Sequence, residues 1–480
     1  MLNVEEQLAL TASEAVTAIA QGNLTAVAYT TTLLDRAESL ADLKTIITLN
    51  REGALAAATR IDDARKAGTA LGPLAGLPLL VKDNINTKDL PTTGGTPALR
   101  DFRPTSDAAV LQPLLAAGAV ILGKANMQEL AFGITNTNLA PFAGIAKNPY
   151  DQSRIPGGSS GGTGAAIAAR IVPAGLGSDT GGSVRIPASF NGIAGLRPST
   201  GGTRHRYPGE GVITLSHTLD TVGPMGRTVS DVALLDSVVT GSPVPAPAAL
   251  AGLRIGVPAA LWSGLERAVD AVVQDAKQRL AGAGVVFVDV DMPEVLALSE
   301  KVIFPVALHE PIEDLPQYLK DSGATGITLQ TIAAQIASPD VQKAFGAVVT
   351  DAQGAAYPDA IAVYRPQLQK IYSDYFTTNG LDAMMFPTCP VLPAPIDPVN
   401  GSGTISVDDG PPVETFSTTI RNMGPGSCAG VPSLSLPAGM TPGGLPVGVD
   451  IEGPVDSDSR ILAVGMAIES ILRPLPAPQL

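Results

Sequence analysis

The chain has 480 residues, of which 45% are hydrophobic and only 16% are charged, so it can bury a large core. Its net charge of −14 argues against a nucleic-acid-binding surface, and it contains no apolar run of about 18 residues that could span a membrane. The N-terminal segment lacks the basic and apolar regions of a secretory signal. We therefore expect a cytoplasmic protein in which Cys389 and Cys428 are buried free thiols.

The first 70 residues predict a group of helices with no chemistry on their faces. A capping box at Thr11–Glu14 begins a helix that ends at Gly22. A second helix follows Thr25, and an alanine-rich helix spans roughly residues 51–67.

The pattern changes after residue 70. Gly76–Val81 predicts a short buried strand, and Lys82 follows at its C-terminal end. Ligands of α/β sheets bind at the carboxyl ends of strands, so Lys82 is a candidate functional residue. A helix over 107–117 and a strand over 119–124 are expected next.

The rest of the chain continues this alternation and contains one long helical stretch. Strand and helix patterns alternate up to about residue 241, and a Pro/Ala-rich connector covers 243–250. Residues 294–379 look largely helical, and we interpret them as an insertion that shapes the substrate pocket. Other strands are expected at 253–257, 285–290, 382–387, 433–436 and 447–451, followed by a closing helix at 459–471.

These elements predict an α/β fold with a mixed central β-sheet that is covered on both faces by helices. We expect one domain over residues 1–480. Its parts are the N-terminal helices (1–70), a core (71–241), the helical insertion (294–379) and a return to the sheet (380–480).

Two glycine-flanked serine clusters organise the middle of the chain. Gly157–Gly162 reads GGSSGG and Asp179–Ser183 reads DTGGS; a helix over 164–170 and a strand over 171–174 are expected between them. Glycine lets a ligand approach the backbone closely, and consecutive amides can hold a developing oxyanion beside an exposed hydroxyl. A flexible linker would not carry this ordered apolar pattern, and no phosphate-binding glycine motif is present. The clusters therefore predict a catalytic serine.

An α/β-hydrolase esterase is an alternative, because Gly157–Gly161 matches Gly-x-Ser-x-Gly. That fold needs a histidine late in the chain, and the only histidines are His205, His217 and His309. Zinc-dependent hydrolysis is also disfavoured, because three scattered histidines are a poor set of ligands and no His-Glu-x-x-His motif occurs. We therefore expect neither a metal ion nor a histidine base.

Several motifs together resemble the amidase signature family: Val81–Asn84, Pro156–Gly162, Gly177–Pro187 and Asn191–Pro198. The resemblance is strong over about residues 71–241 and weaker but consistent over the rest. It implies the amidase-signature fold, and it implies cleavage of amide C–N bonds by a Ser–cis-Ser–Lys triad that needs no cofactor.

By position, the resemblance makes Ser183 the nucleophile, Ser159 the bridging cis-serine and Lys82 the base. Ser160 is the rival for the bridging role. A neutral lysine amine can accept a proton, and a bridging hydroxyl can accept and donate at once. Burial lowers the pKa of such a lysine, and strand alternation should point Asp83 away from its amine.

The resemblance also implies roles around the triad. The oxyanion hole would be formed by the backbone amides of Thr180, Gly181, Gly182 and Ser183. Asp179 and Arg185 would order the loops. The substrate would be lined by Leu130, Ala131, Phe132 and Gly133.

Within the family, Arg204–Gly241 looks most like the arylacetamide type, such as mandelamide and indoleacetamide hydrolases. This predicts a small-molecule amide with an aryl or other apolar acyl group, and relatives also cleave esters, anilides and carbamates. One alternative is the A subunit of a glutamine-dependent tRNA amidotransferase, which usually has Gln-Pro where this chain has Ile186-Pro187. Another is a binding protein that kept the fold, which the intact triad positions disfavour. If the protein forms an oligomer, we expect a homodimer.

Overall fold

A computed structural model describes residues 2–480. An eleven-stranded sheet forms its centre, in the order β1-β3-β2-β4-β6-β5-β12-β13-β9-β7-β8, and β10 and β11 form a separate hairpin. The strands are β1 (Ile46–Leu49), β2 (Pro78–Lys82), β3 (Val120–Ala125), β4 (Ala174–Asp179), β5 (Ala194–Arg197), β6 (Thr221–Gly226), β7 (Arg254–Gly256), β8 (Val286–Val288), β9 (Ala383–Pro387), β10 (Thr404–Ser406), β11 (Pro412–Glu414), β12 (Ser433–Met440) and β13 (Pro446–Glu452).

Helices cover both faces of this sheet. They are α1 (Val4–Ala9), α2 (Ala12–Ala20), α3 (Ala26–Ser39), α4 (Arg51–Lys66), α5 (Gln112–Ala116), α6 (Gly161–Ala168), α7 (Arg185–Phe190), α8 (Val229–Thr240), α9 (Ala259–Trp262), α10 (Arg267–Gly282), α11 (Val295–His309), α12 (Pro311–Asp321), α13 (Leu329–Ala333), α14 (Pro339–Val349), α15 (Tyr357–Asp359), α16 (Arg365–Asn379), α17 (Thr415–Ile420), α18 (Gly424–Ala429) and α19 (Asp458–Leu472).

The sheet is mixed and its helices lie in two layers. β2 pairs in parallel with β3 and β4, whereas β4 pairs antiparallel with β6. Helices α6 and α7 pack on one side of the central strands, and α8, α10 and α19 pack together on the other. This arrangement confirms the α/β class with a mixed sheet covered on both faces.

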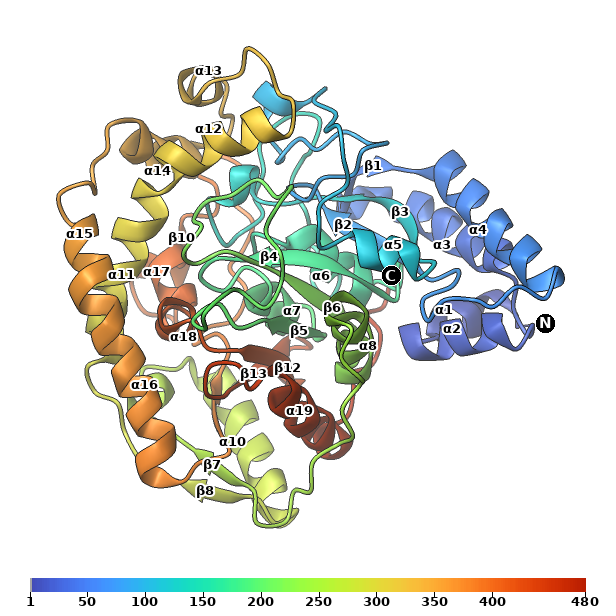
Figure 1. Ribbon diagram of the computed structural model, residues 1–480. Helices are drawn as coiled ribbons and strands as arrows, with labels where there is room; N and C mark the ends of the chain where they lie inside the picture. The colour runs from blue at the N-terminus through green and yellow to red at the C-terminus, as the bar shows by residue number, and fades with distance from the viewer. Residues whose placement is uncertain (1) are drawn as a thin grey trace.

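The helical stretch and the N-terminal helices lie at opposite ends of the molecule. In Figure 1, α1–α4 gather on the right, whereas α11–α16 form the left and upper parts. Residues 294–379 are helical, as their pattern predicts, and α11 and α16 pack against α18 near the central sheet. Within residues 2–480, no helix combines the length and the apolar character that a membrane crossing needs.

The sequence misplaced the strand that carries the second serine cluster. The predicted strand at 171–174 is wrong in its position: residues 171–173 are buried but irregular, and β4 begins only at Ala174. A Cβ added at Gly175 would lie 2.6 Å from the Leu80 oxygen, and one at Gly177 would lie 2.6 Å from Ser160 Oγ. The strand is glycine-rich because its neighbours approach so closely, which removes the usual strand signal.

Two predicted helices have different bounds. The helix expected over 164–170 begins earlier, at Gly161, where a Cβ on Gly162 would lie 2.3 Å from the Asn126 oxygen. The helix expected over 107–117 is only the short α5, because the amides of Ala108 and Ala109 bind carbonyls of distant loops instead.

Candidate active site

The candidate site lies where the carboxyl ends of two parallel strands meet. β2 ends at Lys82, and the neighbouring strand β4 ends at Ser178 and Asp179. Because both strands point the same way, the amine of Lys82 and the hydroxyl of Ser178 lie at one edge of the sheet. Their distance is 2.8 Å between Nζ and Oγ.

The amine of Lys82 is completely buried among oxygen atoms. Its Nζ lies 2.7 Å from Ser159 Oγ, 2.8 Å from Ser178 Oγ and 3.3 Å from the Ser178 carbonyl oxygen. Burial lowers the pKa of Lys82 to about 7, although the carboxylates of Asp179 and Asp220 pull it upward. A substantial fraction of the amine is therefore unprotonated at neutral pH and can act as a base.

The first serine cluster forms the loop before α6, and its two serines have different surroundings. The peptide bond between Gly158 and Ser159 is cis, as the resemblance implies. Ser159 Oγ meets the amine of Lys82, whereas Ser160 Oγ donates to the Ser178 carbonyl and accepts from the Ser178 amide, both at 3.2 Å. Of these two serines, only Ser159 contacts an amine that can act as a base.

Ser183 stands in the loop between β4 and α7, and Asp179 shapes that loop. The Asp179 carboxylate accepts from the amides of Gly182 at 2.8 Å and Val184 at 3.1 Å. Within residues 2–480, the amides of Gly181 and Ser183 have no protein acceptor. The amide of Gly182, one of the four predicted oxyanion donors, is thus already used by Asp179.

Two arginines hold Asp179 from behind. Arg185 forms a two-pronged pair with its carboxylate, with both distances 3.0 Å, and Arg197 contacts it at 3.1 Å. All three side chains are fully buried, and the two guanidinium charges hold the pKa of Asp179 well below its usual range despite burial. Arg185 also donates to Ser427 and Ser433, which connects the loop to α18 and β12.

Asp83 faces away from the amine of Lys82. Its carboxylate accepts from Thr93 and lies 3.4 Å from Nζ of Lys124, a second buried lysine. Asp83 is thus paired with Lys124 and does not hold Lys82 in its charged form.

A largely apolar cavity of about 530 Å³ adjoins Ser183. Loop residues Ala131, Phe132 and Gly133 line it, while Leu130, which was expected with them, is buried in the adjacent core. Much of the remaining apolar lining comes from distant parts of the chain, including Leu215, Ile303, Phe304, Ala307, Leu308, Ala344, Ala347, Phe416 and Ile420. A volume of this size suits a small organic ligand.

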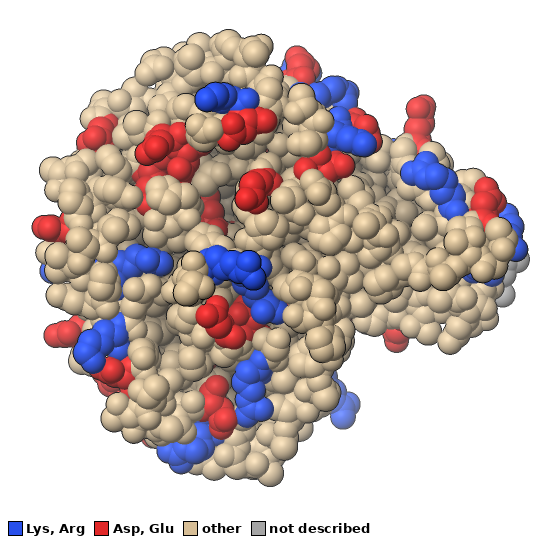
Figure 2. All heavy atoms as spheres, viewed as in Figure 1, with Lys and Arg blue, Asp and Glu red and all other residues tan. Residues whose placement is uncertain are grey.

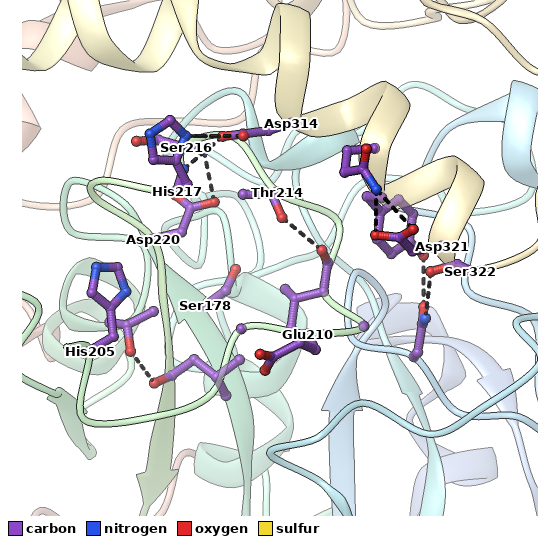
Figure 3. A pocket seen from close by; sticks show the side chains of 18 of the residues that line it. Ser178, His205, Glu210, Thr214, Ser216, His217, Asp220, Asp314, Asp321 and Ser322 are labelled. Carbon is purple, nitrogen blue, oxygen red and sulfur yellow. Dashed lines mark hydrogen bonds and ion pairs between the residues drawn. The ribbon is translucent and has the colours of Figure 1, made fainter.

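A second cavity, of about 460 Å³, has many polar residues in its lining, and we call it the polar cavity; it lies on the other side of residues 214–216. Ser178 and Asp220 line it together with carboxylates such as Glu210 and Asp321 (Figure 3). In Figure 2, acidic side chains surround a hollow in the upper half of the face shown.

The histidines are not at Ser183. His205 and His217 line the polar cavity, and His309 bonds to Asp351 at 2.7 Å. The apolar cavity beside Ser183 is lined by no histidine of the described chain, residues 2–480. This arrangement offers no histidine base for an esterase-like mechanism.

His217, Glu310 and Asp314 hold ligand atoms within 4.8 Å of one another. Glu310 is nevertheless saturated by protein donors, including the hydroxyls of Ser216, Thr218 and Tyr357. We therefore interpret these three residues as part of a hydrogen-bond network and not as a metal site.

Sequence reasoning missed Ser178 and Asp220. Asp220 accepts from the Thr180 hydroxyl at 2.6 Å and from the amides of Leu215 and Ser216, so it ties the Ser183 loop to the cavity wall. Ser178 could have been found from its position one residue before the Asp179 motif, had the strand been placed correctly. Nothing in the sequence near Asp220 marks its partner.

Comparisons with known proteins show that the chain is an amide-hydrolysing enzyme. Residues 28–462 match the Amidase family, and the chain belongs to that family. It is 40% identical to mandelamide hydrolase of Pseudomonas putida over 98% of this chain and 92% of that protein. It is also 40% identical to indoleacetamide hydrolase of Rhizobium radiobacter, over 92% of each. Among solved structures it resembles the native peptide amidase of Stenotrophomonas maltophilia, with a TM-score of 0.83, 29% identity and 98% of each chain covered.

Proposed function

We propose that this amidase hydrolyses small, uncharged amides with an aryl or other bulky apolar acyl group, through an acyl-enzyme on Ser183. The observation that carries the proposal is the 2.7 Å contact between Lys82 Nζ and Ser159 Oγ, next to the backbone bond in which the Ser160 amide donates to the Ser183 carbonyl oxygen at 3.1 Å. Ser183 itself lines the apolar cavity. The names of the two 40% identical relatives support an arylacetamide as substrate.

In the proposed acylation step, the neutral amine of Lys82 takes the proton of Ser159, and Ser159 takes the proton of Ser183. The Ser183 oxygen then forms a bond to the amide carbonyl carbon. Within residues 2–480, Ser183 Oγ has no hydrogen bond to a protein group, so this contact with Ser159 must form when substrate binds, as is common for catalytic contacts in empty enzymes.

The free amides of Gly181 and Ser183, with that of Thr180, are the proposed donors to the tetrahedral oxyanion. Each such donor contributes about 100–1,000-fold to rate in well-studied hydrolases. When the intermediate collapses, the C–N bond breaks and the leaving nitrogen receives the proton from Ser159, which is replenished from Lys82. Water then attacks the acyl-enzyme by the same relay and releases the acid, restoring Ser183.

The direct test is a panel of phenylacetamide, indoleacetamide, glutamine and matched anilides, esters and carbamates with product detection. We expect arylacetamides to be preferred, with esters and carbamates as slower substrates. A serine-reactive phosphonate should label Ser183, as mapped by mass spectrometry. Label on Ser159 would reverse the serine roles, and a clear preference for glutamine would instead favour an amidotransferase subunit.

A further inference from the structure

One wall of the apolar cavity belongs to the helical insertion. Helix α14 contributes Asp340, Lys343, Ala344 and Ala347 to the lining. The segment just before this helix is fastened to the core by two adjacent buried residues, Gln128 and Glu129, which follow β3.

Glu129 binds the insertion and the core at once. Its carboxylate accepts from the Ala337 amide at 3.1 Å and the Ser338 amide at 2.9 Å, directly before α14. It also accepts from the Thr96 hydroxyl of the core at 2.8 Å. The side chain has no exposure to solvent, so these donors, and not water, satisfy its charge.

Gln128 extends the same connection to the triad. Its side-chain amide donates to Asp340 of α14 at 2.8 Å, and its side-chain oxygen accepts from Thr135. Its backbone amide donates to the carbonyl oxygen of Ser159 at 3.1 Å. The insertion and the bridging serine are therefore held by neighbouring groups of one short segment.

The loop after Glu129 has a conformation that needs such support. Leu130 and Ala131 have positive φ angles of 53° and 63°, which side chains other than glycine rarely adopt without enforcement by their surroundings. Phe132 of this loop packs edge-on against Phe345 of α14, with ring centroids 5.7 Å apart. Loop and helix thus form two joined walls of one cavity.

We propose that Glu129 is a positioning residue that sets acyl-group specificity, because it fixes the α14 wall relative to Ser159 and Ser183. Glu129 does not line the cavity itself. Its effect is on the size of the acyl group that fits before the nucleophile. The inference rests on the proposed function, since it concerns which amides reach Ser183.

The test is Glu129→Gln, assayed with indoleacetamide as the large amide and propionamide as the small one. A carboxamide has one accepting oxygen for three donors, and its own NH2 would face an N–H, so the α14 attachment should loosen. We expect KM for indoleacetamide to rise about tenfold or more with kcat nearly unchanged, the pattern of lost substrate binding. For propionamide, kcat/KM should stay within about threefold of the parent.

Glu266→Gln is the matched control. Glu266 also accepts a hydrogen bond from a backbone amide, that of Leu392 at 2.8 Å, but neither Glu266 nor Leu392 lines the cavity. Glu266→Gln should therefore keep the parental KM and kcat for both amides. Thr96→Val removes only the core donor and should shift KM for indoleacetamide in the same direction, which covers a failure of Glu129→Gln to fold.

Equal loss on both amides, or no loss on either, would overturn the specificity role. Calorimetric binding of indoleacetate and propionate provides a readout without turnover. If the parent enzyme hydrolyses neither amide, the proposed function fails independently of the role of Glu129. That role is then tested by whether Glu129→Gln weakens the binding of indoleacetate more than the binding of propionate.

Discussion

In the proposed mechanism, the protonation state of the Lys82 amine controls the reaction. Three oxygen atoms lie within 3.3 Å of Nζ, and Asp83, its neighbour in sequence, is occupied by Lys124. Asp179 is neutralised by two arginines. Burial therefore outweighs the nearby negative charge and keeps the pKa of Lys82 near 7.

We predict that kcat/KM for an amide rises with pH through about 7 and reaches an alkaline plateau. The pKa of Lys82 is lowered to about 7 by burial, so the free-base form needed to accept a proton dominates only above that pH. Lys82→Ala should lose several orders of magnitude. Lys82→Arg should be no better, because a guanidinium stays protonated. Activity of Lys82→Arg close to that of the parent would refute the relay.

The adjacent serines provide a second prediction with a built-in control. Ser159→Ala should lose turnover by about 1,000-fold or more, as expected for a relay member. Ser160→Ala removes hydrogen bonds to Ser178 that hold the backbone, so we expect a loss of only about tenfold, the cost of roughly one hydrogen bond. The measurement is kcat/KM of the parent and the two variants on one arylacetamide. A larger loss in Ser160→Ala would assign the bridging role to Ser160.

At the scale of elements, the two cavity walls from the insertion and the core predict how substrate size is limited. Ala347 of α14 lines the apolar cavity. Ala347→Phe should fill part of the space and raise KM for indoleacetamide about tenfold while propionamide is little affected. Val349→Phe is the matched control, because Val349 is 40% exposed and does not line the cavity. A uniform loss on both amides would show that α14 is not a size-selecting wall.

Local sequence signals predicted the elements whose own residues carry the pattern. The strand before Lys82 is a run of apolar residues, and the two glycine-flanked serine clusters indicate a catalytic serine. The candidate triad itself came from the resemblance of these motifs to the amidase signature family. β4 escaped detection because close packing against Leu80 and Ser160 requires glycines in place of β-branched residues. With that strand misplaced, Ser178 could not be recognised as a neighbour of the Lys82 amine.

Apart from the contact between Lys82 and Ser159 that the family resemblance implies, contacts between distant segments could not be predicted. Glu129 and Ser338 are 209 residues apart, and Arg185 and Ser433 are 248 apart. No periodicity in either segment encodes such a partner. The lining of the apolar cavity has the same origin, because its residues come from the core, the insertion and the segments around β10 and β11.

At the scale of the whole molecule, buried carboxyl groups set how stability responds to pH. Burial raises the pKa of Asp220 and Asp340 to about 6 and that of Glu469 to about 7. It also raises the pKa of Asp450 and Glu452, a close pair beneath Arg185. In the unfolded chain, such groups lose their protons near pH 4. Between about pH 4 and 7, the folded protein therefore binds more protons than the unfolded chain.

Because the folded state binds more protons in that interval, its free energy of unfolding falls as pH rises. The buried lysines act in the opposite sense only above about pH 7 to 8, where the folded protein has released their protons and the unfolded chain has not. We therefore predict that Tm falls by a few degrees between pH 5 and 7.5, while activity rises over the same range. Calorimetry at a series of pH values measures the trend.

Glu469→Gln should flatten this slope without changing activity. Glu469 accepts the Val229 amide at 2.8 Å from α19, far from Ser183 in the sequence and absent from both cavity linings. A glutamine oxygen can accept the same hydrogen bond but has no proton to lose, so its share of the pH dependence should disappear. The variant should gain stability relative to the parent at pH 7.5 more than at pH 5. A parent Tm that rises from pH 5 to 7.5, or a variant with the full parental slope, would show that these carboxyl groups do not titrate as their burial demands.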